Sequence, residues 1–307
     1  MNQCPPDKLI IICGPTGSGK TGFAIDLAQR FRGEIVGADS MQIYRYMDIG
    51  TAKPTRQERL AAAHHMIDIV DPDQDFDAAA YAEMADDCIR KIMKKGKTAF
   101  LVGGTGFYIK ALVYGLFAEG PSDPRIRSRL QREAEREGAA ALHGRLRGVD
   151  GPTAEKIHPN DAYRTIRALE VFEVTGRPLS EFQQRHGFRE KRFTTLEIGL
   201  SWPRPTLYER INRRVDLMMA QGFYQEVQGL LNRGYAPEVK AMQSLGYRHL
   251  VQVICGNTPL TEAVALIKRD HRRYAKRQLT WFGARDSVHW VNPDQKRIAR
   301  EAIRSFL

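Results

Sequence analysis

The chain has 307 residues, of which 42% are hydrophobic and 27% charged, a composition typical of a globular protein large enough for one or two domains. Its apolar runs near the amino terminus are too short for a signal peptide or a membrane span, and its four cysteines form no C-x-x-C pair. These features argue against a membrane protein, a zinc site and a disulfide framework, and we expect a cytoplasmic protein. The net charge of +11 is concentrated in residues 203–307, which hold 18 Lys and Arg against 9 Asp and Glu. This concentration indicates a polyanionic partner, with a solvated basic surface as the alternative.

A phosphate-binding motif follows the first predicted strand, Leu9–Cys13, and precedes a predicted helix, Gly22–Phe31. The pattern G-x-x-x-x-G-K-[ST] is matched at its four fixed positions, and the whole motif consists of Gly14, Pro15, Thr16, Gly17, Ser18, Gly19, Lys20 and Thr21. Glycines let successive N–H groups point into one concavity, and the helix that follows adds its positive amino-terminal end. We therefore expect bound phosphate groups here, with Lys20 as a point charge and the Thr21 hydroxyl reaching a Mg²⁺ ion.

Two further strands end in small polar residues. The predicted strand Glu34–Ala38 is followed by Asp39 and Ser40, and the predicted strand Thr98–Val102 by a Gly-rich turn that contains Thr105. Ligands of parallel α/β sheets bind at the carboxyl ends of the strands, so these residues are expected close to the P-loop. The turn at Thr105 could also be purely structural. No acid follows Val102 where a nucleotide hydrolase often has a Walker-B aspartate, which hints at an acceptor other than water.

The middle of the chain changes character. From residue 117 to residue 195 the sheet-forming runs stop, and helices are predicted at 123–137, 139–149, 161–175 and 179–186. The expected fold is therefore α/β: a P-loop NTPase-like parallel sheet flanked by helices, formed by 1–116 and 196–307, with an all-helical insertion domain at 117–195.

The last third combines a strand at 196–200 with basic helices. A helix at 206–220 carries Arg210 and Arg214 four residues apart, so both side chains share a face suited to a diphosphate or simply to solvent. A helix at 268–281 places basic residues on one side and an apolar stripe on the other. Tyr274 and Trp281 stand among its charges, a combination that favours nucleic acid over a membrane surface.

Several blocks of the sequence together resemble the tRNA dimethylallyltransferase family. The P-loop at 14–21 is followed by A-D-S-M-Q-I-Y at 38–44, M-D-I-G-T-A-K-P at 47–54 and V-G-G-T-G-F-Y at 102–108. Further blocks continue in the family's order: H-P-N-D at 158–161, R-A-L-E-V at 167–171, S-L-G-Y-R at 244–248 and A-K-R-Q-L-T-W-F at 275–282. The P-loop alone would be weak support for the family, whereas the ordered set is specific.

The resemblance implies transfer of the dimethylallyl group of dimethylallyl diphosphate to N6 of the adenine 3′-adjacent to the anticodon in tRNA, with release of diphosphate. The P-loop would then hold a leaving group, and Lys20, Thr21 with Mg²⁺, and Arg214 would neutralise its growing charge. An adenine amine is a weak nucleophile, and Asp39 is the carboxylate expected to accept its proton.

The resemblance also implies the residues that contact tRNA. Those at the target adenine are Asp39, Ser40, Met41 and Gln42. Those elsewhere are Thr105, Arg127, Tyr163, Arg164, Thr165, Ile166, Arg167, Gln243, Ser244, Leu245, Gly246, Tyr247, Arg248, Lys276, Arg277, Gln278, Thr280 and Trp281. The sequence departs from the family at Gly283, where members often carry a basic residue. We expect the compact bacterial form, without the zinc finger of some eukaryotic members, and a monomer.

Two rival functions have less support. A small-molecule P-loop kinase would use the helical insertion as a lid but would not need the basic last third. A nucleotide-gated RNA-binding module would bind RNA without forming a covalent product. Neither accounts for the ordered motifs.

Overall fold

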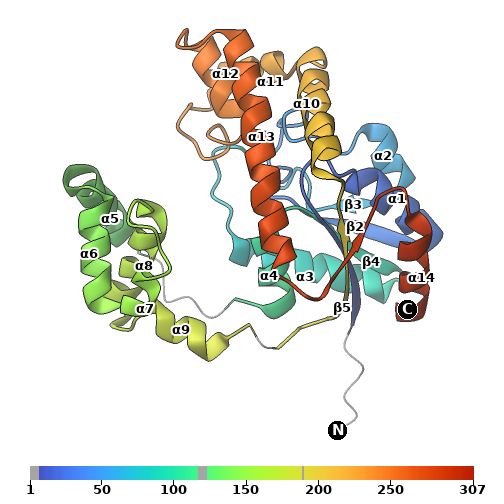
Figure 1. Cartoon of the computed structure of the whole chain (residues 1–307), viewed down its shortest axis with the longest axis horizontal. Helices are drawn as coiled ribbons and strands as arrows, with labels where there is room; N and C mark the ends of the chain where they lie inside the picture. Colours follow the sequence, from blue (N-terminus) through green and yellow to red (C-terminus); the bar gives the residue numbers. More distant parts are fainter. Residues whose placement is uncertain (1–6, 117–122, 189) are drawn as a thin grey trace. The chain divides into compact units, whose positions relative to one another are not determined.

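The computed structural model describes residues 7–116, 123–188 and 190–307, which divide into two compact units (Figure 1). The first unit contains the chain up to Val113 and again from Arg192 to the carboxyl terminus, and the second contains residues 114–191. The expected start of the insertion, residue 117, lies outside the described residues. Within the described residues no helix is both long and apolar enough to cross a membrane.

The first unit is built on a six-stranded sheet with the order β3-β2-β4-β1-β5-β6, in which all neighbouring strands are parallel. This confirms the expected α/β fold with a parallel sheet. The strands are β1 (Lys8–Cys13), β2 (Gly33–Ala38), β3 (His64–His65), β4 (Thr98–Gly103), β5 (Thr194–Leu200) and β6 (Val288–Val291). Their continuous apolar runs are those of strands buried on both faces, and residues 9–13 of β1 are fully buried.

Helices surround the sheet, and all of them except α2, which has no buried residue, bury apolar side chains. Phe23 and Leu27 of α1 share a core cluster with Ile10 of β1 and Ile303 of α14. The α3 helix packs against β2 and β4, where the Tyr81 hydroxyl donates to the Gly37 carbonyl at 2.9 Å. The helices of this layer are α1 (Lys20–Arg30), α2 (Arg56–Ala61), α3 (Ala78–Lys94), α4 (Gly106–Tyr114) and α14 (Lys296–Phe306).

The sheet order brings the chemically important turns together. Strands β2, β4 and β1 are consecutive neighbours, so the P-loop after β1, Asp39 after β2 and Thr105 after β4 lie at one edge. The Ser40 backbone N–H donates to the Thr105 hydroxyl at 3.0 Å, which ties two of these turns directly.

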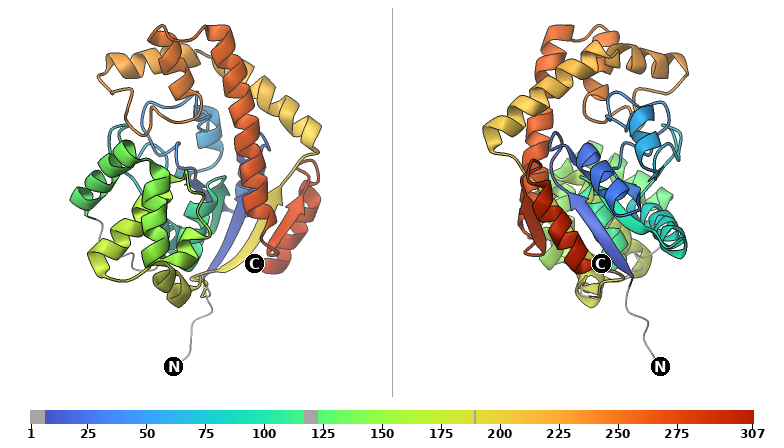
Figure 2. Two further views of the ribbon diagram at one scale, coloured as in Figure 1. Left: turned by 60° about the vertical axis from the view of Figure 1, so that its left-hand side comes forward. Right: turned by 90° about the vertical axis from the view of Figure 1, so that its right-hand side faces the viewer.

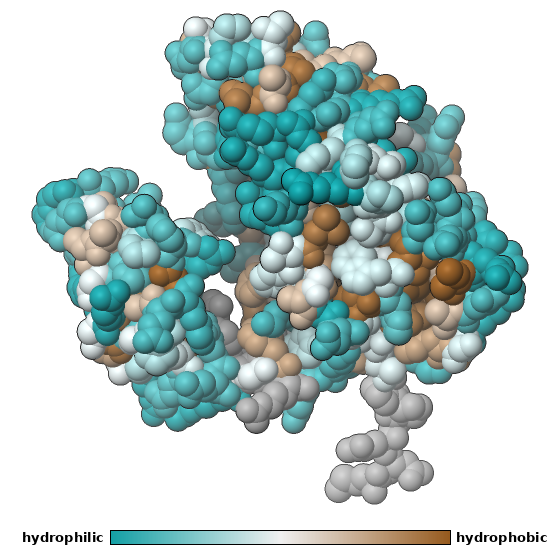
Figure 3. All heavy atoms as spheres, viewed as in Figure 1, coloured by the Kyte–Doolittle hydropathy of each residue, from teal (hydrophilic) through white to brown (hydrophobic). Residues whose placement is uncertain are grey.

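A helical group stands beyond this edge of the sheet (Figure 2). It comprises α10 (Arg204–Ala220), α11 (Phe223–Asn232), α12 (Tyr247–Ile254) and α13 (Leu260–Gly283). The long α13 helix packs against both α10 and α12. It begins at Leu260 and not at Lys268 as the sequence suggested, because the buried Ala263 and Ile267 extend its apolar side. Hydrophilic side chains cover much of α13 in the view of Figure 3.

The second unit has its own small core. Its helices are α5 (Pro124–Glu137), α6 (Ala139–Val149), α7 (Gly151–Ala154), α8 (Ala162–Thr175) and α9 (Leu179–His186). Leu130 of α5, Leu142 and Leu146 of α6, and Leu169 of α8 are buried together at its centre. The Asp123 side chain caps α5 by accepting from the Arg125 backbone N–H at 2.8 Å, and Pro124 occupies the first helical position.

Candidate active site

The P-loop adopts the strained turn that its glycines predict. Gly14, Gly17 and Gly19 have φ values of 140°, 80° and 91°, which residues with a side chain rarely adopt. A Cβ at Gly17 would also stand only 2.9 Å from the Ile211 side chain of α10. The loop is therefore specified both by backbone conformation and by the close approach of a helix.

Donors from three parts of the chain hold the carbonyl groups of the loop. The bonds are Lys20 Nζ to Gly14 O (3.0 Å) and Pro15 O (2.8 Å), Arg210 Nε to Gly17 O (3.0 Å), and Trp202 Nε1 to Ser18 O (3.1 Å). Carbonyl oxygens repel a phosphate, so engaging them with donors preserves the positive character of the loop. Arg210 thus braces the loop backbone, and its guanidinium also stacks over the Trp202 ring at 4.8 Å.

Two half-buried cations are held at the loop. Burial lowers the pKa of Lys20 to about 8, with the nearby Arg214 charge acting in the same direction and Asp39 opposing it. Burial also lowers the pKa of Arg214, and Asp39 again opposes the shift. Arg214 Nη1 donates to Thr16 Oγ1 at 3.2 Å, while its buried Nε has no hydrogen-bond partner. An anion at this position would relieve both unfavourable environments.

Asp39 uses one carboxylate oxygen to shape its own turn. Oδ1 accepts from the backbone N–H groups of Met41 at 2.8 Å and Gln42 at 3.3 Å, as in an Asx turn. Among the described residues none donates a hydrogen bond to Oδ2. Asp39 therefore combines a fixed orientation with one carboxylate oxygen available to a ligand.

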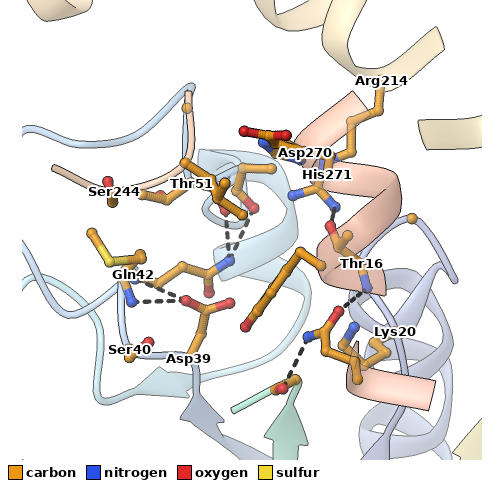
Figure 4. A pocket seen from close by; sticks show the side chains of 18 of the residues that line it. Thr16, Lys20, Asp39, Ser40, Gln42, Thr51, Arg214, Ser244, Asp270 and His271 are labelled. Atoms are coloured by element: carbon orange, nitrogen blue, oxygen red, sulfur yellow. Dashed lines mark hydrogen bonds between the residues drawn. The ribbon is translucent and has the colours of Figure 1, made fainter. Parts of the chain in front are cut away.

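These groups line one cavity of about 730 Å³ in the first unit. Figure 4 shows Asp39 and Gln42 on one side, Thr16 and Lys20 opposite them, and Arg214 and His271 beyond. Predicted tRNA contacts that also line it are Ser40, Met41, Gln42, Gln243, Ser244, Leu245, Tyr247, Arg248, Arg277 and Gln278. The cavity thus brings together the P-loop, the end of β2, the turn before α12 and one face of α13.

Gln278 links α13 to two of the turns at the cavity. Its side chain is buried, with Oε1 accepting from the Thr16 backbone N–H at 2.8 Å and Nε2 donating to the Gly104 carbonyl at 2.9 Å. It connects α13 to the P-loop and to the turn after β4. Lys276, Thr280 and Trp281 of the same helix are exposed and do not line the cavity.

Other predicted contacts lie in the second unit or behind the cavity wall. Arg127 and Arg167 both donate to Glu170, a buried carboxylate whose pKa is lowered by hydrogen bonds from these arginines despite its burial. Tyr163 and Arg164 are exposed, whereas Thr165 and Ile166 are buried. Thr165 and Ile166 therefore pack inside the second unit. In the first unit, Gly246 is buried and does not line the cavity.

Sequence reasoning missed two cavity residues on α13. Asp270 accepts hydrogen bonds from Arg248 at 2.8 Å and Arg269 at 3.0 Å, and these bonds lower the pKa of its carboxyl group against the effect of burial. Burial, reinforced by the charge of Arg214, lowers the pKa of His271 to about 4, so this histidine is neutral at pH 7. The helical spacing of Asp270, Tyr274 and Gln278 was a usable signal, because residues four apart share a face.

The residues present fit a magnesium ion bound together with a substrate. The described residues contain no group of three or more His, Cys, Asp or Glu side chains that could hold a metal by themselves. The Thr21 hydroxyl lines the cavity and has no hydrogen-bond partner within the described part of the chain. Mg²⁺ commonly takes one or two protein ligands and completes its shell with substrate phosphates and water, which this arrangement allows.

Comparisons with known proteins identify relatives of this chain. The family model described as IPP transferase matches residues 42–285. A tRNA dimethylallyltransferase of Desulfosudis oleivorans is 55% identical over 294 residues, covering 95% of this chain and 93% of that protein. The crystal structure of a full-length tRNA isopentenylpyrophosphate transferase from Bacillus halodurans is 37% identical, covers 98% of each chain and has a TM-score of 0.72. A eukaryotic dimethylallyltransferase acting on tRNA is 28% identical, with a TM-score of 0.82, over 96% of this chain and 77% of that one.

Proposed function

The chain belongs to the tRNA dimethylallyltransferase family, and on that premise we propose that it moves a dimethylallyl group from dimethylallyl diphosphate to N6 of the adenine 3′-adjacent to the anticodon of tRNA. It is a transferase that modifies tRNA. One observation carries the finer assignment: Asp39 lines the same cavity as Lys20 and Arg214. A nucleobase amine and a diphosphate ester can therefore be held in contact there.

The diphosphate of the donor substrate is assigned to the P-loop, from Thr16 to Thr21. Its negative charge would offset the effect of burial, which lowers the pKa values of Lys20 and Arg214. As the bond between carbon and oxygen breaks, negative charge grows on the leaving diphosphate. Both cations therefore stabilise the transition state more strongly than they stabilise the bound substrate.

Asp39 is assigned as the general base. The adenine N6 lone pair forms the new bond to the dimethylallyl carbon, the bond from that carbon to the diphosphate oxygen breaks, and diphosphate leaves. An N6 proton passes to Asp39 Oδ2, the oxygen that no described residue occupies. Because Oδ1 is fixed by two backbone N–H groups, the carboxylate can accept that proton without reorienting.

The Thr21 hydroxyl is the protein ligand proposed for Mg²⁺, with the diphosphate supplying further oxygen ligands. When bound, the ion would neutralise charge on the leaving group. Thr21 belongs to the first turn of α1, next to Lys20, so both act on the same phosphate groups.

The anticodon stem-loop of tRNA is assigned to the basic side of α13 and the segment before α12. Arg248, Arg273 and Arg277 line the cavity on this side and are exposed. Their charge suits the phosphates that flank an adenine extruded from its stack. Arg127, Tyr163 and Arg164 are proposed as further contacts of the second unit.

We also propose that the protein acts in the cytoplasm as a monomer.

The direct test is incubation with labelled dimethylallyl diphosphate, Mg²⁺ and an unmodified anticodon stem-loop, followed by mass analysis of the nucleosides. We expect N6-dimethylallyl-adenosine and one diphosphate per product. Release of diphosphate without formation of the modified nucleoside would contradict the proposal. Turnover of ATP in place of dimethylallyl diphosphate would contradict it as well.

A further inference from the structure

Glu226 of α11 lies outside the cavity lining, yet its carboxylate accepts hydrogen bonds from three consecutive backbone N–H groups. Oε2 accepts from Asp48 at 2.8 Å and from Ile49 at 2.7 Å, and Oε1 accepts from Gly50 at 3.0 Å. The Tyr247 hydroxyl adds a fourth bond, to Oε1 at 2.6 Å. A carboxylate with four donors is firmly oriented, so it holds the 48–50 segment in place.

The same segment also packs against two aromatic rings. A Cβ at Gly50 would stand 2.2 Å from Phe223 and 2.6 Å from Tyr247, so only glycine lets the backbone lie this close. The two rings pack edge to face at 4.9 Å between centroids. Glu226 and these rings therefore fix the position of the backbone that follows, including the carbonyl groups of Thr51 and Ala52.

Those carbonyl groups orient Gln42 in the cavity. Gln42 Nε2 donates to Thr51 O at 3.2 Å and to Ala52 O at 3.1 Å, which uses both amide hydrogens. In Figure 4 the amide nitrogen points to the Thr51 backbone and the side chain lies beside Asp39. Among the described residues none donates to Gln42 Oε1, so this oxygen remains available as an acceptor next to the carboxylate of Asp39.

The two neighbouring acceptors, Asp39 Oδ2 and Gln42 Oε1, match a purine that has an amino group at position 6. The exocyclic amine of adenine has two N–H groups, one for Asp39 Oδ2 and one for Gln42 Oε1. A 6-oxo purine offers a carbonyl oxygen at that position, which would face both acceptors without a hydrogen bond. A site built to hydrogen-bond an N–H group discriminates strongly against an analogue that lacks it, because its own polar groups are then left unpaired.

We propose that Glu226 is a positioning residue for base selection: through the 48–52 loop it holds the Gln42 amide so that the pocket accepts a 6-amino purine and rejects a 6-oxo purine. This inference rests on the proposed function, since it assumes that the cavity receives the target base. Gln42 touches the base, and Glu226 acts through it.

The test compares the binding of two anticodon stem-loops, one with adenine and one with hypoxanthine at the target position, in the absence of isoprenoid diphosphate so that no transfer occurs. The wild-type protein should prefer adenine by about tenfold or more, the discrimination expected of a well-placed base contact. Glu226→Gln places an amide NH₂ against backbone N–H groups and should lower this preference about fivefold or more. Gln42→Met, which removes the acceptor itself, should lower it at least as much.

The matched control is Glu262→Gln, the same change at an exposed position in the first turn of α13, which should leave the preference unchanged. The ratio of two affinities is the deciding quantity, because a general loss of stability weakens both complexes alike. An unchanged ratio in folded Glu226→Gln would overturn the inference.

If Glu226→Gln does not fold, Glu226→Asp decides, since its shorter side chain keeps the charge but cannot reach all the donors that bond to Glu226, and it should reduce the ratio by a smaller factor; an unchanged ratio there would overturn the inference as well. The fate of the proposed function is read separately, from product formation by the wild-type protein with the adenine stem-loop. Product together with an unchanged ratio refutes only the role of Glu226.

Discussion

Replacing Asp39 by asparagine separates the two tasks of this residue. Its Oδ1 shapes the turn by accepting from the Met41 and Gln42 backbone N–H groups, and its Oδ2 is the proposed proton acceptor. In Asp39→Asn the new side chain would keep an amide oxygen for the turn but would present an NH₂ donor to the adenine amine. Asp39→Ala removes both tasks at once.

The expected magnitudes differ clearly between these variants. Loss of a general base costs about 10² to 10⁴ in rate, or roughly 3–5 kcal/mol of activation free energy. The turn bonds survive in Asp39→Asn, so its free energy of unfolding should fall less than that of Asp39→Ala. Asp39→Ala leaves two backbone N–H groups without their acceptor and should also lower the free energy of unfolding by about 1–2 kcal/mol.

Single-turnover rates at saturating stem-loop and dimethylallyl diphosphate measure the chemical step. Thermal unfolding measures how much the loss of the turn's hydrogen bonds lowers the free energy of unfolding. Binding of the stem-loop without donor substrate should be largely retained in both variants, because most of its contacts lie elsewhere. If Asp39→Asn transfers the dimethylallyl group within about tenfold of the wild-type rate, the carboxylate is not the base and the mechanism proposed above is wrong.

Three further predictions concern the cations. Burial lowers the pKa of Lys20 to about 8, and a bound diphosphate would raise it. Titration calorimetry should therefore show that rising pH above about 8 weakens the binding of inorganic diphosphate more in the wild-type protein than in Lys20→Gln, and equal pH dependence in the two proteins would exclude Lys20 from the site. Arg214→Ala should raise the KM for dimethylallyl diphosphate and lower kcat, whereas the exposed Arg210→Ala should have the smaller kinetic effect; equal kinetics for the two would exclude Arg214 from the site. The double variant Lys276→Ala and Arg277→Ala should weaken stem-loop binding and reduce the slope of log K against log salt by up to about two, and an unchanged slope would mean that these side chains are only solvated.

The sequence alone did not show which residues of α13 face solvent and which face the P-loop. Its charges and aromatic residues suggested one RNA-facing side, but neighbouring positions on a helix point in different directions. Lys276 and Arg277 are exposed, while Gln278 turns inward and bonds to Thr16 and Gly104. The direction in which each side chain points depends on how α13 packs against α10 and α12. The apolar stripe of a helix predicts which side is buried, but it does not predict which polar side chains meet partners from other segments.

Long-range partners were equally hidden. Arg210 and Arg214 share a helix face, yet Arg214 reaches the Thr16 hydroxyl inside the site and Arg210 braces the Gly17 carbonyl from outside. Glu226 gave no signal either, since a single glutamate on an amphipathic helix resembles any solvent-exposed charge. Its partners are the backbone N–H groups of residues 48–50, far from it in the chain. Every residue except proline has such a group, so residue identity does not reveal which ones a side chain will contact.

By itself the sequence determined the features that depend on local geometry. The P-loop follows from glycines at positions where the backbone must adopt positive φ, and Asp39 and Thr105 were predicted close to it because parallel strands end at a common edge. In the structure Asp39 lines the cavity, and Thr105 accepts a hydrogen bond from Ser40. The tertiary structure decided which polar groups from distant segments meet, including the bonds of Gln278 to the P-loop and those of Glu226 to the 48–50 backbone. The physical reason is that hydrogen bonds require donor and acceptor within about 3 Å, and only the packing of whole helices against the sheet sets such distances between residues far apart in the chain.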